Sequence, residues 1–226
     1  MQIAIPLFDR FTALDAVGPY QVLSAIPGAE VRFLGPEAGP VKTDDRMLTV
    51  LAEGRWEDLP DPAVVVVPGG IGTRSLLHDH RLLDWVRAAH ATSTYTTSVC
   101  TGSLVLAAAG ILDGLDATTH WTQRERLREL GARPVPDRVV EQGKVVTAAG
   151  VSAGIDMALR LTELLAGAEI AQAAQLGIEY DPQPPFDAGA PEKAPAEIVD
   201  LVRAAVASAD AEALGRPASA ASGSGG

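Results

Sequence analysis

The chain has 226 residues and a formal net charge of −11, with 47% hydrophobic and 21% charged residues. This composition is ordinary for a globular protein with one main core, and its acidic balance disfavours nucleic acids and anionic membrane surfaces, which bind through clustered Lys and Arg. Residues 1–10 lack the basic start and cleavage site of a secretory signal, and no apolar run reaches the roughly 20 residues of a bilayer span, so we expect a cytoplasmic protein.

The first third of the chain alternates strands and helices. The apolar pattern predicts a strand at 2–8, a helix at 14–26, a strand at 30–34, a hairpin within 41–56 and a strand at 62–68. The last of these strands is the most β-like run in the chain and ends in Pro68-Gly69-Gly70. Such an ending is typical of a central strand that leads into a glycine loop.

The rest of the chain continues this alternation. The predicted elements are a helix at 81–90, a strand at 93–99, a helix at 104–109, a strand at 118–120, a helix at 122–130, paired segments at 138–140 and 144–147, and helices at 155–165, 168–176 and 194–214. This order predicts an α/β fold with an open, mostly parallel sheet covered on both faces. We expect one domain over 1–214 and a disordered tail at 215–226, which has nothing to bury.

Cys100 is the only cysteine in the sequence, and it separates a predicted strand from a predicted helix. A single cysteine forms neither an intramolecular disulfide nor a thiolate metal cage, which leaves an inert buried thiol or a reactive one. The first-turn N–H groups of the helix favour a thiolate, and the small Gly102 and Ser103 permit the sharp turn of a nucleophile elbow. Cys100 is therefore a candidate nucleophile. The four histidines show no metal-binding pattern, so we expect no metal.

Other candidate residues follow predicted strands, where ligands bind in an open α/β sheet. Asp15 lies in an apolar stretch in which burial would raise its pKa and allow proton transfer near neutral pH; the alternative is a helix N-cap. Gly69 and Gly70 either present N–H groups to a substrate atom that gains negative charge or form only a turn. His120 is either a partner of the thiol or a polar residue at a strand end.

Several ordered motifs resemble the ThiJ/PfpI superfamily of class I glutamine amidotransferase-like proteins. They are TSVCTG at 97–102, AAGILDG at 108–114 and ATTHW at 117–121. Within that superfamily, LDAVGP at 14–19, VPGG at 67–70, AGVSAGID at 149–156 and QLGIEYDPQPPF at 175–186 most resemble the isocyanide hydratases. The resemblance spans roughly residues 1–190 and is too specific for chance.

The resemblance implies a flavodoxin-like three-layer sandwich, a homodimer and a cysteine nucleophile at the elbow. It also implies that Asp15 is the acid that works with Cys100, that Thr101 lines the site, and that the backbone around Gly150 and Val151 contacts the sulfur. The implied reaction is the hydration of a small-molecule isocyanide to an N-substituted formamide through a thioimidate, without a cofactor.

The sequence differs from other branches of the superfamily at residues on which their functions depend. PfpI-type proteases have His directly after the cysteine, where this chain has Thr101, and glutamine amidotransferases need a late His-x-Glu, whereas no histidine follows His120. AraC-type regulators carry a helix-turn-helix domain behind this one, for which a helix at 194–214 is too little. Two alternatives stay open: a glyoxalase-like enzyme that acts on α-oxoaldehydes, and a redox sensor in which Cys100 is oxidised to a sulfinate.

Overall fold

The computed structural model describes residues 1–213, and the chain divides into two units, Met1–Pro182 and a second unit that begins at Gln183. The first unit contains the sheet, and the second contains helix α8 (Ala196–Ala213). A single domain over 1–214 therefore stays a prediction. The tail predicted at 215–226 lies outside the described residues.

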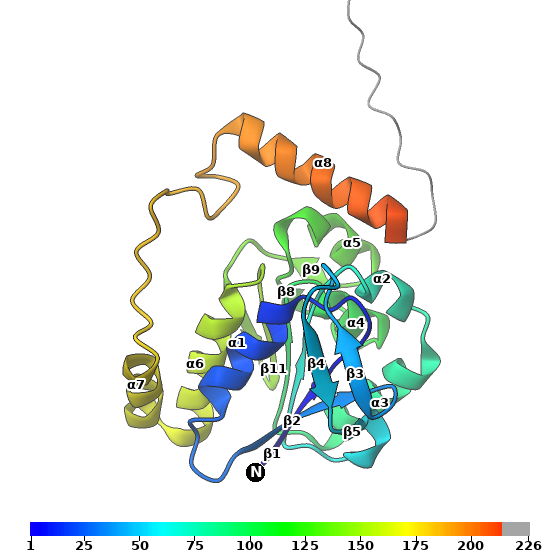
Figure 1. The fold of residues 1–226 in the computed structure, drawn as a ribbon, viewed down its shortest axis with the longest axis vertical. Helices are drawn as coiled ribbons and strands as arrows, with labels where there is room; N and C mark the ends of the chain where they lie inside the picture. Colours follow the sequence, from blue (N-terminus) through cyan, green and yellow to red (C-terminus); the bar gives the residue numbers. More distant parts are fainter. Residues whose placement is uncertain (214–226) are drawn as a thin grey trace, which may run out of the picture. The chain divides into compact units, whose positions relative to one another are not determined.

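A seven-stranded sheet forms the centre of the first unit, with the order β10-β11-β7-β6-β1-β2-β5 (Figure 1). All neighbouring strands are parallel except β10 and β11. The strands are β1 (Gln2–Pro6), β2 (Glu30–Gly35), β5 (Gly54–Arg55), β6 (Val64–Val67), β7 (Tyr95–Val99), β10 (Val139–Gln142) and β11 (Val145–Ala148). All four valines of β6 are fully buried, because a central strand is covered on both faces.

Two groups of helices cover the sheet. Helices α1 (Ala13–Leu23), α6 (Ala153–Ala166) and α7 (Ala168–Gly177) pack in sequence on one face. Helix α4 (Gly102–Ala108) lies on the other face in contact with α2 (Thr73–Leu76), α3 (His80–Thr92) and α5 (Arg124–Glu129). The predicted flavodoxin-like three-layer sandwich is confirmed. Within residues 1–213, no helix has the length and apolar character needed to cross a membrane.

The smaller elements show where the sequence pattern succeeds and where it fails. The predicted hairpin is present as the antiparallel pair β3 (Gly39–Lys42) and β4 (Thr49–Ala52), although it begins at Gly39 and not within 41–56. The strand predicted at 118–120 is wrong, because β8 (Asp116–Ala117) ends before it and pairs instead with β9 (Arg133–Pro134). The N–H of Thr118 donates to the Thr147 hydroxyl at 2.9 Å, so a side chain takes the place of a ladder partner. The 3₁₀ helices η1 (Trp56–Asp58) and η2 (Trp121–Gln123) complete the elements.

The sheet order explains why distant parts of the chain meet. Strands β11, β7, β6 and β1 are consecutive neighbours and run in one direction. Their carboxyl ends therefore lie at the same end of the sheet, where Ala149, Cys100 and Pro68 follow β11, β7 and β6. This end of the sheet holds the candidate site.

Candidate active site

Cys100 occupies a tight turn between β7 and α4, with a φ of 55° in the left-handed region. A non-glycine residue in this region costs about 1–3 kcal/mol and persists only where its surroundings fix it. The Cys100 N–H donates to the carbonyls of Ala148 at 3.1 Å and Ala149 at 3.0 Å, which ties the turn to the end of β11. A Cβ at position 102 would lie 2.1 Å from the Val67 carbonyl oxygen, so the elbow requires Gly102. The predicted elbow is confirmed.

Two side-chain hydroxyl groups bind the carbonyl oxygen of Cys100. Ser103 Oγ and Thr119 Oγ1 donate to the Cys100 carbonyl at 3.1 and 3.0 Å, and both side chains are fully buried. The sequence analysis gave neither residue this role, although Thr119 belongs to the ATTHW motif. The structure explains that motif in part: Thr119 supports the strained turn from a neighbouring loop.

Asp15 is fully buried in the first turn of α1, and it is not the helix N-cap. The cap position belongs to Thr12, whose hydroxyl donates to Asp44 at 2.7 Å. Asp15 Oδ2 accepts a hydrogen bond from the Gly69 N–H at 2.9 Å. Its other oxygen, Oδ1, is buried and has no partner in ordinary hydrogen-bond geometry among the described residues. The remaining side-chain interaction of the carboxyl group is with the Cys100 thiol.

The environment of Asp15 raises its pKa to about 8. Burial is the main cause, since it disfavours the charged carboxylate, and the negative charge of Asp44 adds to it. The Gly69 N–H and the nearby Cys100 thiol act in the opposite direction and lower the pKa in part. The predicted upward shift is therefore confirmed, and the carboxyl group is mostly protonated at neutral pH.

The pKa of the Cys100 thiol is also raised, which corrects the expectation that a helix N-terminus would make it a ready thiolate. Burial is the largest cause, and the Asp15 carboxylate raises the pKa further. Hydrogen bonds from the N–H groups of Val151 and Thr101 and the positive charge of Arg74 lower it, but they do not outweigh burial. Cys100 and Asp15 therefore form a coupled pair that holds its protons at neutral pH.

The glycine loop after β6 connects Asp15 to Thr101, the residue after Cys100. Gly69 donates its N–H to Asp15, and the Gly70 N–H donates to the Thr101 hydroxyl at 2.9 Å. A Cβ at position 69 would lie 2.7 Å from Asp15 Oδ2 and 2.6 Å from the Thr101 nitrogen, so only glycine fits between them. Both loop N–H groups are thus committed to side chains of the site.

Gly150 and Val151 lie in the loop that follows β11. Val151 has a φ of 23°, a strained value for a β-branched residue, and its N–H is directed at the sulfur. His120 packs against this loop, since a Cβ at position 150 would lie 2.8 Å from His120 Cδ2. His120 Nδ1 lies 2.8 Å from the Thr122 hydroxyl. The structure therefore places His120 beside the Val151 loop.

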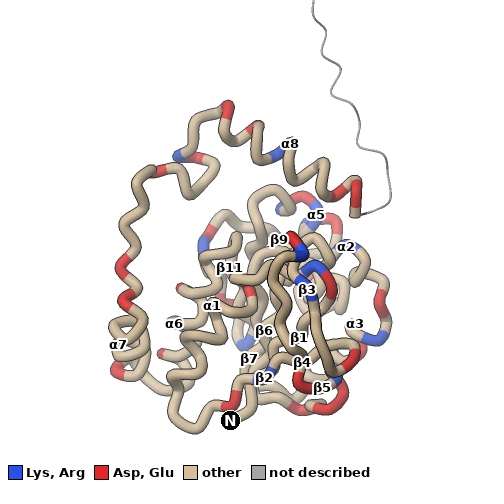
Figure 2. The backbone as a smooth tube through the Cα atoms, in the orientation of Figure 1, with Lys and Arg blue, Asp and Glu red and all other residues tan. Residues whose placement is uncertain are grey.

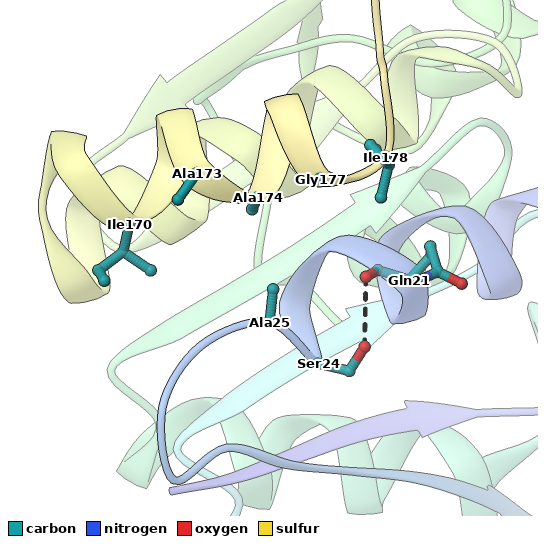
Figure 3. A pocket seen from close by; sticks show the side chains of 8 residues that line it. All are labelled: Gln21, Ser24, Ala25, Ile170, Ala173, Ala174, Gly177 and Ile178. Atoms are coloured by element: carbon teal, nitrogen blue, oxygen red, sulfur yellow. Dashed lines mark hydrogen bonds between the residues drawn. The ribbon is translucent and has the colours of Figure 1, made fainter.

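A surface hollow of about 430 Å³ lies between α1 and α7, at a different place from Cys100 (Figure 3). Its lining residues are Gln21, Ser24, Ala25, Ile170, Ala173, Ala174, Gly177 and Ile178. None of the predicted site residues is among them. Within residues 1–213, no group of three or more His, Cys, Asp or Glu side chains is arranged to hold a metal ion.

Residues 1–164 match the DJ-1/PfpI family. The chain belongs to that family. It is 46% identical over 203 residues to the isonitrile hydratase of Pseudomonas putida, covering 90% of this chain and 89% of that protein. It is also similar to the crystal structure of a ThiJ/PfpI family protein from Pseudomonas syringae, with a TM-score of 0.88 and 37% identity over 94% of this chain and 90% of that one. A more distant relative, the glutathione-independent glyoxalase DJR-1.2 of Caenorhabditis elegans, is 25% identical over 63% of this chain and 76% of that protein.

Proposed function

We propose that this chain hydrates an isocyanide to an N-substituted formamide, with Cys100 as nucleophile and Asp15 as proton donor and acceptor. The observation that carries the proposal is the buried Cys100–Asp15 pair, in which the Gly69 N–H orients a carboxyl group whose pKa is raised to about 8 and the Cys100 thiol interacts with the same carboxyl group. The 46% identity to an isonitrile hydratase supports the same reaction.

The first step adds the thiol across the terminal carbon of the isocyanide. This carbon carries a lone pair and is also open to nucleophiles. Protonated Asp15 donates its proton to the carbon, the sulfur forms the C–S bond, and the thiol proton passes to the carboxyl group. The product is a thioimidate, R–N=CH–S, on Cys100. Asp15 ends the step protonated, which explains why a raised pKa suits the reaction.

The second step hydrolyses the thioimidate. Water adds to the carbon while Asp15 takes one of its protons and returns a proton to the nitrogen. The C–S bond of the tetrahedral adduct then breaks, the sulfur takes the hydroxyl proton, and the formamide leaves. Every atom of the product comes from the isocyanide and one water, so these steps consume no other reactant and no oxidant or reductant.

The backbone supplies the rest of the site. The N–H groups of Thr101 and Val151 stabilise negative charge on the sulfur whenever its proton leaves. The Thr101 hydroxyl is held by Gly70, and Gly69 orients Asp15. We propose that Gly150 completes the substrate wall beside Val151, and that His120 supports this wall rather than acting as a base.

Incubation of the purified protein with cyclohexyl isocyanide and, separately, with methylglyoxal tests the proposal. We expect formamide from the first and no lactate from the second, each followed by proton NMR. Lactate without formamide would favour the glyoxalase alternative. Absence of both products, together with a sulfinate on Cys100 after mild peroxide, would favour the redox sensor.

The charge pattern supports a small-molecule substrate. Figure 2 shows acidic and basic residues spread over many elements of the described chain, and several arginines pair with acids, such as Arg160 with Glu141 and Arg133 with Asp116. Within the described chain, this mixed pattern contains no feature that suits a nucleic acid or an anionic membrane.

We propose that the protein is a cytoplasmic homodimer with no nucleic-acid or membrane partner. Light scattering after size-exclusion chromatography tests the dimer, and a monomer mass would contradict it.

A further inference from the structure

Behind the glycine loop lies a buried hydroxyl cluster, defined by the side chains of Thr73 and Thr101. Thr73 Oγ1 lies 3.2 Å from Thr101 Oγ1 and 2.8 Å from the Gly70 carbonyl oxygen, and Thr101 Oγ1 lies 3.2 Å from the same carbonyl. Both threonines are almost fully buried. The cluster therefore holds the hydroxyl of Thr101, the residue next to the nucleophile, against the glycine loop.

Arg74 closes this cluster from the outside. Its Nη1 donates to the Gly70 carbonyl at 3.1 Å and to the Thr73 hydroxyl at 2.9 Å. The Thr73 hydroxyl has one proton, so it cannot donate to the Gly70 carbonyl and to Thr101 Oγ1 at the same time. Because Arg74 is a charged donor to both the Thr73 hydroxyl and the Gly70 carbonyl, it fixes which of these bonds form. Arg74 is half-buried as a residue, which limits screening of its charge by water.

We propose that Arg74 is a positioning residue for the reaction of Cys100, which acts through Gly70 and Thr73 to hold Thr101 and which places a positive charge behind the nucleophile. The proposal rests on the proposed function for its catalytic part only. Two observations support it: the hydrogen bonds of Arg74 end on the loop that connects Asp15 to Thr101, and its charge lowers the pKa of the Cys100 thiol.

The variants Arg74→Leu, Arg74→Gln and Arg74→Lys separate charge from hydrogen bonding. Leu removes both, Gln keeps a neutral donor, and Lys keeps the charge. The control is Arg87→Leu, because Arg87 also donates to a backbone carbonyl, that of Ala109 at 2.9 Å, and pairs with Asp84 on α3. Loss of Arg87 thus costs the same kind of bond and the same charge without touching the glycine loop.

The first readout is the rate of alkylation by iodoacetamide from about pH 7 to pH 10, which reports only Cys100 because the chain has one cysteine. We expect Arg74→Leu and Arg74→Gln to react about threefold more slowly at each pH, which corresponds to about half a pKa unit of thiolate population, because four other contributions to the thiol pKa are larger than that of Arg74. Arg74→Lys and Arg87→Leu should stay within about 1.5-fold of the wild type.

The second readout is isocyanide turnover, in which we expect the neutral variants to lose kcat with little change in KM. If Arg74→Leu does not fold, Arg74→Gln carries the test. Unchanged alkylation rates in the neutral variants, or an equal loss in Arg87→Leu, would overturn the proposal. Alkylation does not depend on the substrate, so a failure of isocyanide turnover in the wild type would count against the proposed function and not against Arg74.

Discussion

The two ends of strand β7 both bury polar side chains, but they satisfy them differently. Near the amino end, Thr96 Oγ1 lies 2.9 Å from both His90 Nδ1 and Ser93 Oγ, and Lys144 donates to the carbonyls of His90 and Ser93. At the carboxyl end, Cys100 is held at a positive φ next to Asp15, whose Oδ1 has no partner among the described residues. A satisfied cluster stabilises a fold, whereas an unsatisfied and strained one is available for chemistry.

The largest expected effect comes from removing the sulfur at the carboxyl end. Cys100→Ser should keep the fold and lower kcat/KM by at least about a thousandfold (~4 kcal/mol), because a hydroxyl gives up its proton far less readily than a thiol. Formamide production followed by NMR measures the loss, and circular dichroism checks the fold. Substantial turnover in a folded variant would remove Cys100 from the mechanism.

Asp15→Asn tests the other member of the pair. The amide keeps the shape of the side chain but neither gives nor takes a proton, so we expect kcat to fall by about 10²–10⁴. A purely structural role, in which the side chain only accepts the Gly69 N–H, allows near-normal rates, since the amide oxygen of Asn accepts the same bond. Steady-state kinetics with an isocyanide distinguish the two, and near-wild-type turnover would leave Asp15 with a structural role only.

Thr96→Val probes the amino end of the same strand. Loss of the hydroxyl removes a hydrogen-bond partner of both His90 and Ser93, which should lower the free energy of unfolding by about 1–3 kcal/mol. Activity should stay within about twofold of the wild type under conditions in which the protein is folded. Urea unfolding measures the first effect. A large loss of kcat at unchanged stability would break the proposed contrast between the two ends.

Only a modest effect on turnover, and no measurable loss of stability, is expected for His120→Asn. His120 contacts Gly150 and bonds Thr122, and Asp15 already carries the protons in the proposed mechanism, so turnover should fall by less than about tenfold. The measurement is kcat/KM across pH, alongside alkylation of Cys100. A fall beyond about a thousandfold with a higher thiol pKa would identify His120 as the base.

The sequence predicted most of the sheet, because long apolar runs such as 62–68 have one stable location in an α/β fold. It also predicted the elbow at Cys100 and the raised pKa of Asp15. It did not predict helix α2, which carries Thr73 and Arg74, since a four-residue helix has no periodicity to detect. The predicted downward shift of the Cys100 pKa was wrong. A helix N-terminus can be recognised in the sequence, whereas the burial that raises this pKa depends on tertiary packing.

The central claim, that protonated Asp15 acts with Cys100, is tested most directly by the pH dependence of isocyanide hydration in the wild type. A carboxyl group whose pKa is raised to about 8 carries its proton below that pH and loses it above. We therefore predict that kcat/KM is constant from about pH 6 to pH 7 and falls about tenfold per unit beyond pH 8. A rate that keeps rising to pH 10, as a free thiolate would give, would contradict the account.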